Sequence, residues 1–216
     1  MRRTAVFGGT FNPIHYGHLL LADEILEVLG LDRVLFVPAA VPPHKAAATV
    51  APATDRYAMV QLAIAGHRGF EASDVELQRP GPSYTVDTLQ ALSAPDQTLF
   101  LLIGSETFLD LLSWRTPQRV ASLARLVVVP RTSSSFDPES AAAQKVLREI
   151  GGERFAHVDG PDVPARGVLI LHAASLPISS SDLRARVVEG RSLAYRVPPA
   201  VEAYIATHGL YGGRAS

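Results

Sequence analysis

The chain of 216 residues contains no cysteine and no long apolar stretch. The absence of cysteine excludes disulfides, thiolate metal sites and cysteine nucleophiles. No stretch approaches the roughly 20 apolar residues of a membrane span, and the apolar run near the N-terminus, 4–7, is too short for the core of a signal peptide. We therefore expect a cytoplasmic protein with no membrane partner.

A net charge of either sign is also nearly absent. Lysine and arginine together number 20, aspartate and glutamate 21, and the formal net charge is −1. The surface as a whole therefore has no strong attraction for nucleic acid, and an anionic ligand must be held by a local site. We expect no nucleic-acid partner.

Strand-like and helix-like segments alternate along the chain. Short runs rich in branched aliphatic residues predict strands that are buried on both faces, at 4–9, 33–38, 98–104, 125–130 and 167–173. Apolar residues at three- and four-residue spacing predict helices at 19–29, 55–65, 86–92 and 141–150. This order is typical of an α/β fold with a doubly wound, Rossmann-like parallel sheet. The length suits one domain, 1–216, with a small helical C-terminal part at about 178–211.

The segment FGGTFNPIHYGHL, 7–19, joins the first predicted strand to the first predicted helix. In open α/β sheets, ligands bind at the carboxyl ends of the strands. Gly8 and Gly9 let a ligand approach the backbone there, and a helix that begins near Gly17 directs unpaired amides toward it. These features predict a phosphate site. The sequence has neither G-x-G-x-x-G nor G-x-x-x-x-G-K-[ST], which disfavours a hydride-transferring Rossmann enzyme.

His15 and His18 lie three residues apart at the same helix start. Both rings can face one anion and donate hydrogen bonds to phosphoryl oxygens, whose charge grows during a transfer reaction. A zinc site is the competing interpretation, but no third histidine or carboxylate lies nearby in the sequence. Either histidine alone would more often be structural. We interpret the pair as phosphate ligands and expect no protein metal site.

The string GGTFNPIHYGHL resembles the N-terminal signature of the H-x-G-H nucleotidyltransferase superfamily, and specifically that of bacterial nicotinate-nucleotide adenylyltransferases. The H-x-G-H motif alone would be shared with pantetheine-phosphate adenylyltransferases and cytidylyltransferases. Further segments resemble the adenylyltransferase family in order along nearly the whole chain: VPPHK (41–45), SYTVDTL (83–89), LLIGSETFLDLLSW (101–114), LVVVPR (126–131), ISSSDLRARV (178–187) and VPPAVEAYIATHGLY (197–211).

The resemblance implies that the chain binds ATP. The segment ISSSDLR, 178–184, is either a well-capped helix start or, as in the family, a grip on the ATP phosphates. The predicted catalytic residues are His15, His18 and Arg184. The predicted ATP-binding residues are Gly8, Gly9, Thr10, Phe11, His15, His18, Gly104, Glu106, Ile178, Ser179, Ser180 and Arg184.

The resemblance also implies a site for nicotinate mononucleotide. Trp114, the only tryptophan, either packs in the core or stacks on the pyridine ring, while backbone amides near Thr85 and Arg115 would meet the carboxylate of the ring. His44 and Lys45 are either an anion clamp or solvated loop charges. The predicted mononucleotide-binding residues are Asn12, His44, Lys45, Ser83, Tyr84, Thr85, Trp114 and Arg115.

Two positions depart from the usual pattern of this family, which reads G-G-T-F-D-P at the first motif and G-A-D at the later one. Asn12 replaces the commoner aspartate, so it keeps the hydrogen-bonding shape but lacks the charge. Glu106 stands where the shorter aspartate is usual, and its carboxylate has a different reach. The roles of both residues toward ribose or magnesium are therefore open.

The predicted reaction is direct adenylyl transfer. The 5′-phosphate of nicotinate mononucleotide attacks the α-phosphorus of ATP in line, which gives the dinucleotide and pyrophosphate without a covalent enzyme intermediate. Mg²⁺ is the expected cofactor, bound mainly through the ATP phosphates. The alternatives are another H-x-G-H enzyme, such as a pantetheine-phosphate adenylyltransferase, and a non-catalytic nucleotide-binding module. The sequence leaves open a homo-oligomer and the preference between the acid and the amide of the pyridine ring.

Overall fold

The computed structural model describes residues 1–42, 50–130, 136–164 and 166–212. In these ranges seven strands form one sheet in the order β3-β2-β1-β4-β5-β7-β6, and every neighbouring pair is parallel. The strands are β1 (Arg2–Gly9), β2 (Arg33–Pro38), β3 (Phe70–Ala72), β4 (Gln97–Gly104), β5 (Arg125–Val129), β6 (Phe155–His157) and β7 (Val168–Ile170).

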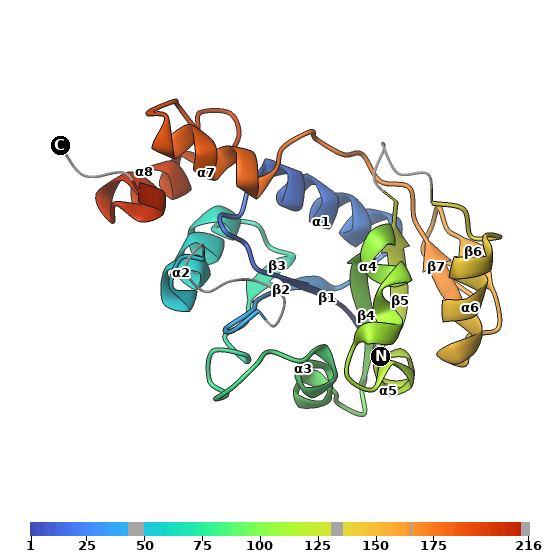
Figure 1. Cartoon of the computed structure of the whole chain (residues 1–216). Helices are drawn as coiled ribbons and strands as arrows, with labels where there is room; N and C mark the ends of the chain where they lie inside the picture. The colour runs from blue at the N-terminus through green and yellow to red at the C-terminus, as the bar shows by residue number, and fades with distance from the viewer. Residues whose placement is uncertain (43–49, 131–135, 165, 213–216) are drawn as a thin grey trace.

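Helices cover both faces of the sheet, which makes the fold doubly wound (Figure 1). The helices are α1 (Tyr16–Val28), α2 (Ala53–Ile64), α3 (Thr85–Leu92), α4 (Ser105–Leu109), α5 (Pro117–Leu123), α6 (Ala141–Glu149), α7 (Ser180–Val188) and α8 (Pro199–Thr207), with short 3₁₀ turns η2 (Leu111–Ser113) and η3 (Leu210–Gly212). In Figure 1, α1, α7 and α8 lie on one side of the sheet, and α3 and α5 lie on the other.

Successive residues of the strands point to opposite faces of the sheet and pack in two separate apolar cores, as expected for strands buried on both faces. Ala5 of β1 packs in the core that contains α1, whereas its neighbour Val6 packs in the core that contains α3 and α5. In β4, Phe100 and Leu101 divide between the same two cores. This arrangement fixes the register of the central strands, because a slip by one residue would exchange the two faces.

The strand order reverses between β1 and β4. From β1 the chain proceeds to β2 and β3 on one side, and then returns to β4 beside β1. Loops that leave β1 and β4 therefore diverge, and a crevice opens at the carboxyl ends of these two strands. Gly9 ends β1 and Gly104 ends β4, so the first predicted motif and the GSE segment meet at this crevice.

The predicted α/β class and the parallel sheet are confirmed. All five predicted strands and all four predicted helices occur, although β7 (Val168–Ile170) is shorter than predicted and α1 begins three residues earlier. The helices α7 and α8 lie in the predicted C-terminal part. The short strands β3 and β6 and the short helices α4 and α5 were not predicted, because segments this brief carry little periodicity. No helix in the described ranges is long and apolar enough to span a membrane.

Candidate active site

A cavity of about 790 Å³ lies at the carboxyl ends of β1 and β4. Its walls come from the two strand ends, from the start of α3, from α4 and from the segment around η2. The predicted residues that line it are Gly8, Gly9, Thr10, Ser83, Tyr84, Thr85, Gly104, Glu106, Trp114 and Arg115. The structure thus brings together, at the reversal of the strand order, ten predicted residues from four short segments that are distant in the sequence.

The two glycines at the end of β1 have different steric roles. A Cβ atom added at Gly8 would meet no other atom within 4 Å, so this position opens directly into the cavity. A Cβ atom added at Gly9 would lie 3.0 Å from Cζ of Phe11. Phe11 is 2% exposed and packs edge-on to the ring of His18, with the ring centroids 5.2 Å apart. Gly9 therefore makes room for the aromatic side chain that supports His18.

His15 and His18 form one stacked pair at the start of α1. Their ring centroids are 3.7 Å apart, and Nδ1 of His18 accepts a hydrogen bond from the backbone N–H of His15 at 3.2 Å. His15 is 6% exposed, and burial lowers its pKa to about 4. Its Nδ1 is buried and has no hydrogen-bond partner among the described residues. At neutral pH His15 is thus an uncharged ring that can donate or accept a hydrogen bond.

The start of α7 lies against the loop between β1 and α1. Ser180 Oγ donates to the carbonyl of Pro13 at 2.9 Å, and Arg184 Nη1 donates to the carbonyl of Asn12 at 2.8 Å. Ser179 caps the helix, since its Oγ accepts from the backbone N–H of Asp182 at 3.1 Å. The capped-helix interpretation is therefore confirmed. The structure also places the serine-rich segment beside the H-x-G-H loop, where a phosphate role remains a prediction.

The position of Trp114 fits both interpretations of the sequence. Its partly buried side chain packs against the core that contains α3 and α5, and it also lines the cavity. The neighbouring Arg115 lies over the ring of Tyr84, with its Cζ atom 5.0 Å from the ring centroid. Nη1 of Arg115 is 3.7 Å from the carboxylate of Asp87 in the first turn of α3. The aromatic side chains of Trp114 and Tyr84 and the guanidinium group of Arg115 therefore all line this part of the cavity.

Three predicted mononucleotide ligands have other contacts or cannot be placed. Asn12 is 3% exposed, its Oδ1 accepts from the backbone N–H of Ala51 at 3.0 Å, and it is not among the residues that line the cavity. Its oxygen holds a neighbouring loop, and a contact between Asn12 and the mononucleotide stays a prediction. His44 and Lys45 lie outside the described residues.

Ser83 does line the cavity, but its hydroxyl serves the backbone. Its Oγ accepts from the N–H of Ala40 at 3.0 Å, and its own N–H donates to the carbonyl of Val41 at 3.1 Å. Ser83 thus joins the segment after β2 to the start of α3. It shapes the cavity wall and is also close enough to contact a ligand.

Arg56 was not among the predicted site residues, but it organises the same region. The side chain is 1% exposed and donates to four backbone carbonyls, those of Ala51, Thr10, Ala39 and Ala40, at 2.8, 2.7, 2.6 and 3.2 Å. Two of these residues, Thr10 and Ala39, line the cavity. The signal in the sequence is its register, since Arg56 lies on the helix face that buries Met59, Val60 and Ile64.

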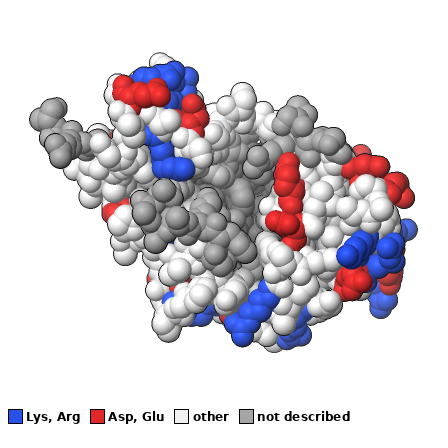
Figure 2. Space-filling view, in the orientation of Figure 1, with Lys and Arg blue, Asp and Glu red and all other residues white. Residues whose placement is uncertain are grey.

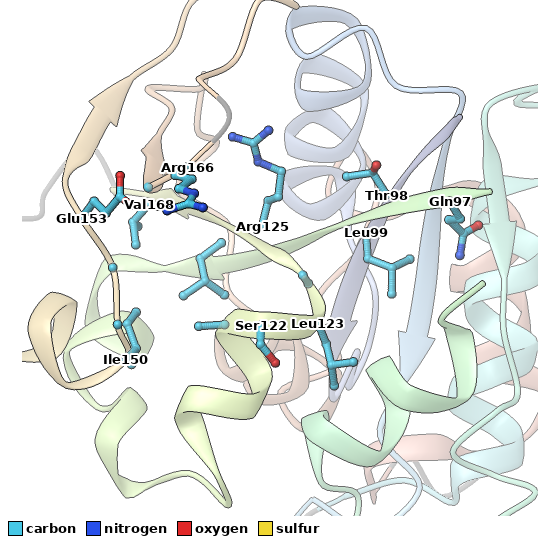
Figure 3. Close-up of a pocket in the computed structure, with 16 residues that line it drawn as sticks. Gln97, Thr98, Leu99, Ser122, Leu123, Arg125, Ile150, Glu153, Arg166 and Val168 are labelled. Atoms are coloured by element: carbon cyan, nitrogen blue, oxygen red, sulfur yellow. Dashed lines mark hydrogen bonds and ion pairs between the residues drawn. The ribbon is translucent and has the colours of Figure 1, made fainter. Parts of the chain in front are cut away.

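A second cavity, of about 460 Å³, lies at the other end of the strands, where their amino ends are (Figure 3). Its wall includes Gln97, Arg125 and Val168, which begin β4, β5 and β7. Arg166 and Glu153 also line it, and they are paired at 2.8 Å. This cavity contains no predicted site residue and lies at the amino ends of the strands, away from the crevice that the strand order creates.

Comparison with known proteins places this arrangement in a class. The family model of cytidylyltransferase-like proteins matches residues 6–186, which span β1 to α7. Among solved structures, Plasmodium falciparum nicotinic acid mononucleotide adenylyltransferase has the same fold. Its complex with NaAD superposes with a TM-score of 0.76 and its complex with APC with 0.74, at 18% and 17% sequence identity, and the match covers 100% of each chain. The class is therefore that of the cytidylyltransferase-like nucleotidyltransferases.

Sequence relatives narrow this class to one family. A protein of Synechococcus sp. (strain JA-3-3Ab) is 42% identical over 97% of this chain and 95% of its own length. One of Thermus thermophilus is 44% identical over 97% and 99%, and one of Roseiflexus sp. (strain RS-1) is 44% identical over 95% and 96%. Each is named probable nicotinate-nucleotide adenylyltransferase. The chain belongs to the nicotinate-nucleotide adenylyltransferase family, as its motifs predict.

Proposed function

We infer that this chain joins the adenylyl group of ATP to nicotinate mononucleotide, with release of pyrophosphate and formation of nicotinate adenine dinucleotide. Membership of the family supports this reaction. The observation that carries it within the structure is the cavity at the reversal of the strand order, in which Trp114, Arg115 and the start of α3 stand beside the glycines of the first motif. Its assembly state and its cytoplasmic location remain predictions.

Catalysis in this proposal comes from positioning and from charge stabilisation. The phosphate of the mononucleotide is itself the nucleophile, so no side chain has to attack. Holding two anionic substrates in line replaces a bimolecular encounter, and hydrogen-bond donors then stabilise the charge that grows on the phosphoryl oxygens. The residues at the β1–α1 junction are suited to this task because they lie at the carboxyl end of the strand where both substrates would meet.

We propose that His18 is the main donor to the transferred phosphoryl group. Its Nδ1 accepts the N–H of His15, so in the neutral ring the proton lies on Nε2. Nε2 can therefore donate to a phosphoryl oxygen. His15 is neutral at pH 7 because its pKa is lowered to about 4, so it acts through a hydrogen bond and not through a full charge. The stacking of the two rings at 3.7 Å fixes their orientation before substrate binds.

We propose that Arg184 binds the leaving pyrophosphate together with the serines at the start of α7. One nitrogen of its guanidinium group, Nη1, bonds the carbonyl of Asn12, and the other, Nη2, donates to Ser181 Oγ at 3.2 Å. These contacts hold the planar group beside the β1–α1 loop. A guanidinium group has five N–H donors, so further donors remain for phosphate oxygens.

We propose that the pyridine ring stacks on Trp114 and that its carboxylate lies near Thr85 and Arg115. Trp114 and Arg115 are adjacent in the chain, and both line the cavity. Thr85 is the first residue of α3, where backbone amides are not used within the helix. A role for His44 and Lys45 in binding the mononucleotide is still a prediction.

We propose that Mg²⁺ enters as its complex with ATP. Within the described residues, no group of three or more histidine, aspartate or glutamate side chains is arranged to hold a metal ion. Mg²⁺ in nucleotide sites needs only one or two carboxylates in addition to phosphates and water. Bound Mg²⁺ would neutralise phosphate charge, and we assign no step of the reaction to a magnesium cage built by the protein.

The decisive experiment measures pyrophosphate release. The purified chain is incubated with ATP, Mg²⁺ and nicotinate mononucleotide, and in parallel with nicotinamide mononucleotide or phosphopantetheine as acceptor. We expect pyrophosphate and a dinucleotide with the pyridine acceptors, and neither product with phosphopantetheine. His18→Ala serves as the control for contaminating activity. Turnover with phosphopantetheine alone, or with no acceptor at all, would contradict the proposal.

A further inference from the structure

The cavity wall has an unexpected balance of charge for a site that takes anionic substrates. Among the described residues that line it, Glu76, Glu106 and Asp110 are acidic and only Arg115 is basic. Glu106 and Asp110 are exposed on and just after α4. Figure 2 shows acidic side chains over α4 at the edge of the central hollow. Solvent screens these two carboxylates strongly, so the buried Glu76 has the larger effect on the inside of the cavity.

Glu76 is a buried carboxylate with an incomplete set of hydrogen bonds. Its side chain is 7% exposed. One oxygen, Oε1, accepts from Thr88 Oγ1 at 2.5 Å. The other, Oε2, is buried and has no hydrogen-bond partner among the described residues. Leaving a charged oxygen without a partner in a buried position is costly, so Glu76 requires an explanation beyond the stability of the free protein.

Two arginines outside the cavity wall compensate this charge, without a close ion pair to Glu76. Burial lowers the pKa of Arg56, and the charge of Glu76 acts to raise it. Arg79 reaches Glu76 through a hydroxyl group. Its Nη2 donates to Thr88 Oγ1 at 3.0 Å, so a single hydroxyl stands between the cation and the carboxylate. Glu76 and Thr88 both line the cavity, whereas Arg79 does not. The carboxylate of Glu76 therefore has a larger effect on the electrostatic potential inside the cavity than the guanidinium group of Arg79 has. Thr88 also lies one turn after Thr85, on the same helix whose first turn would meet the pyridine ring.

We propose that Glu76 is a specificity-determining residue that stabilises the positive charge of the pyridine ring. This inference rests on the proposed function. The ring nitrogen of nicotinate mononucleotide is bonded to ribose, so the ring is a pyridinium cation, while its carboxylate is an anion. Arg115 and the amides of α3 suit the carboxylate, but they do not suit the cationic ring. A buried carboxylate in the same wall supplies the missing complement.

The test is a binding cycle that changes the charge of the ring and the charge of residue 76 separately. The ligands are nicotinate mononucleotide and its dihydro form, in which hydride reduction leaves the ring uncharged. The proteins are the wild type and Glu76→Gln, which keeps the shape and an oxygen that can accept from Thr88. Dissociation constants are measured by calorimetry without ATP and without Mg²⁺, so that a metal ion at the acidic residues cannot contribute.

We expect the wild type to bind the oxidised ligand at least tenfold more tightly than the dihydro ligand. Glu76→Gln should reduce that ratio by about tenfold, which corresponds to about 1.4 kcal/mol of coupling. Glu149→Gln removes an equal charge from an exposed position on α6 and should leave the ratio unchanged. Because both ligands stack on Trp114, the cycle separates the charge of Glu76 from the contribution of stacking.

Each of the following results would overturn the inference. An equal loss of affinity for both ligands, together with a lower melting temperature, would make Glu76 a purely structural support for α3. A gain in affinity for both would mean that the carboxylate only repels the anionic ligand. An unchanged ratio of the two dissociation constants would mean that Glu76 does not interact with the charge of the ring. If Glu76→Gln does not fold, a wild-type preference below tenfold still refutes the idea. Absence of any mononucleotide binding to the wild type would instead count against the proposed function.

Discussion

Replacement of Arg56 provides the sharpest test of how the cavity is assembled. The guanidinium group joins three separate backbone segments, at Thr10, at Ala39 and Ala40, and at Ala51. Burial lowers the pKa of Arg56, while the charge of Glu76 opposes that effect. The group stays protonated because the pKa of arginine is far above 7. The side chain therefore acts as a charged hub whose hydrogen bonds compensate for its desolvation.

Arg56→Met keeps an unbranched apolar stem of similar shape, is shorter by the guanidinium group and removes every donor. Each carbonyl left without a partner costs roughly 1–3 kcal/mol when it stays buried. The removal of a buried charge recovers part of this loss. We therefore expect a net loss of about 2–4 kcal/mol in the free energy of unfolding. Arg56→Lys should lose about half as much, because one ammonium group cannot reach all three segments.

The assay combines denaturant unfolding with steady-state kinetics. Since Thr10 and Ala39 belong to the cavity wall, the KM for the mononucleotide should rise in Arg56→Met at temperatures where the variant is folded. Arg148→Met, in which an exposed arginine of α6 is replaced, serves as the control and should change neither quantity. Our reasoning is refuted if Arg56→Met unfolds within about 0.5 kcal/mol of the wild type and keeps its KM, since surface substitutions have effects of that size.

Three further substitutions test the proposed roles. His18→Ala should lower kcat by about 10²-fold with a smaller change in KM, and near-normal turnover would remove this histidine from the mechanism. Arg184→Ala should weaken ATP binding or turnover and leave mononucleotide binding nearly intact, whereas equal losses for both would indicate a displaced α7. Trp114→Ala should weaken mononucleotide binding by about 1–3 kcal/mol. Because the indole also packs on the core, it should lower the free energy of unfolding by about 2 kcal/mol, less than the roughly 3–5 kcal/mol of a fully buried aromatic residue. Saturable quenching of its fluorescence by mononucleotide measures the first effect, and an absence of quenching would contradict it.

The sheet could be predicted from the sequence because each central strand is a run of aliphatic residues buried on both faces. Such a run, rich in branched residues and bounded by turn signals, favours a strand without information from its neighbours. The position of the crevice could be predicted from the same pattern, since Gly8 and Gly9 are the last two residues of the first run. By contrast, β3 and β6 have three residues each and depend on the strands beside them. Their formation is a tertiary effect that no local pattern records.

The roles of single polar side chains were much harder to predict, because they depend on which loops meet in space. Asn12 has a side-chain amide that could bind a ligand, but its Oδ1 accepts a hydrogen bond from the backbone N–H of Ala51. Arg56 and Glu76 were not recognised at all, since each acts through partners distant in the sequence. A charged residue in register with the buried face of a helix was the one available sign, and it applied only to Arg56.

The glycine of the H-x-G-H motif illustrates why a motif can be recognised more easily than explained. Gly17 follows the first residue of α1, and an ordinary helical backbone at this position would accept any side chain. The constraint is the ring of His15, since a Cβ atom at residue 17 would lie 3.0 Å from its Nδ1 and 3.1 Å from its Cε1. A side chain at residue 17 would therefore require the ring of His15 or the helix start to shift by a few tenths of an ångström. Gly17 thus leaves the close space that the stacked histidine pair occupies, and it is not a source of flexibility.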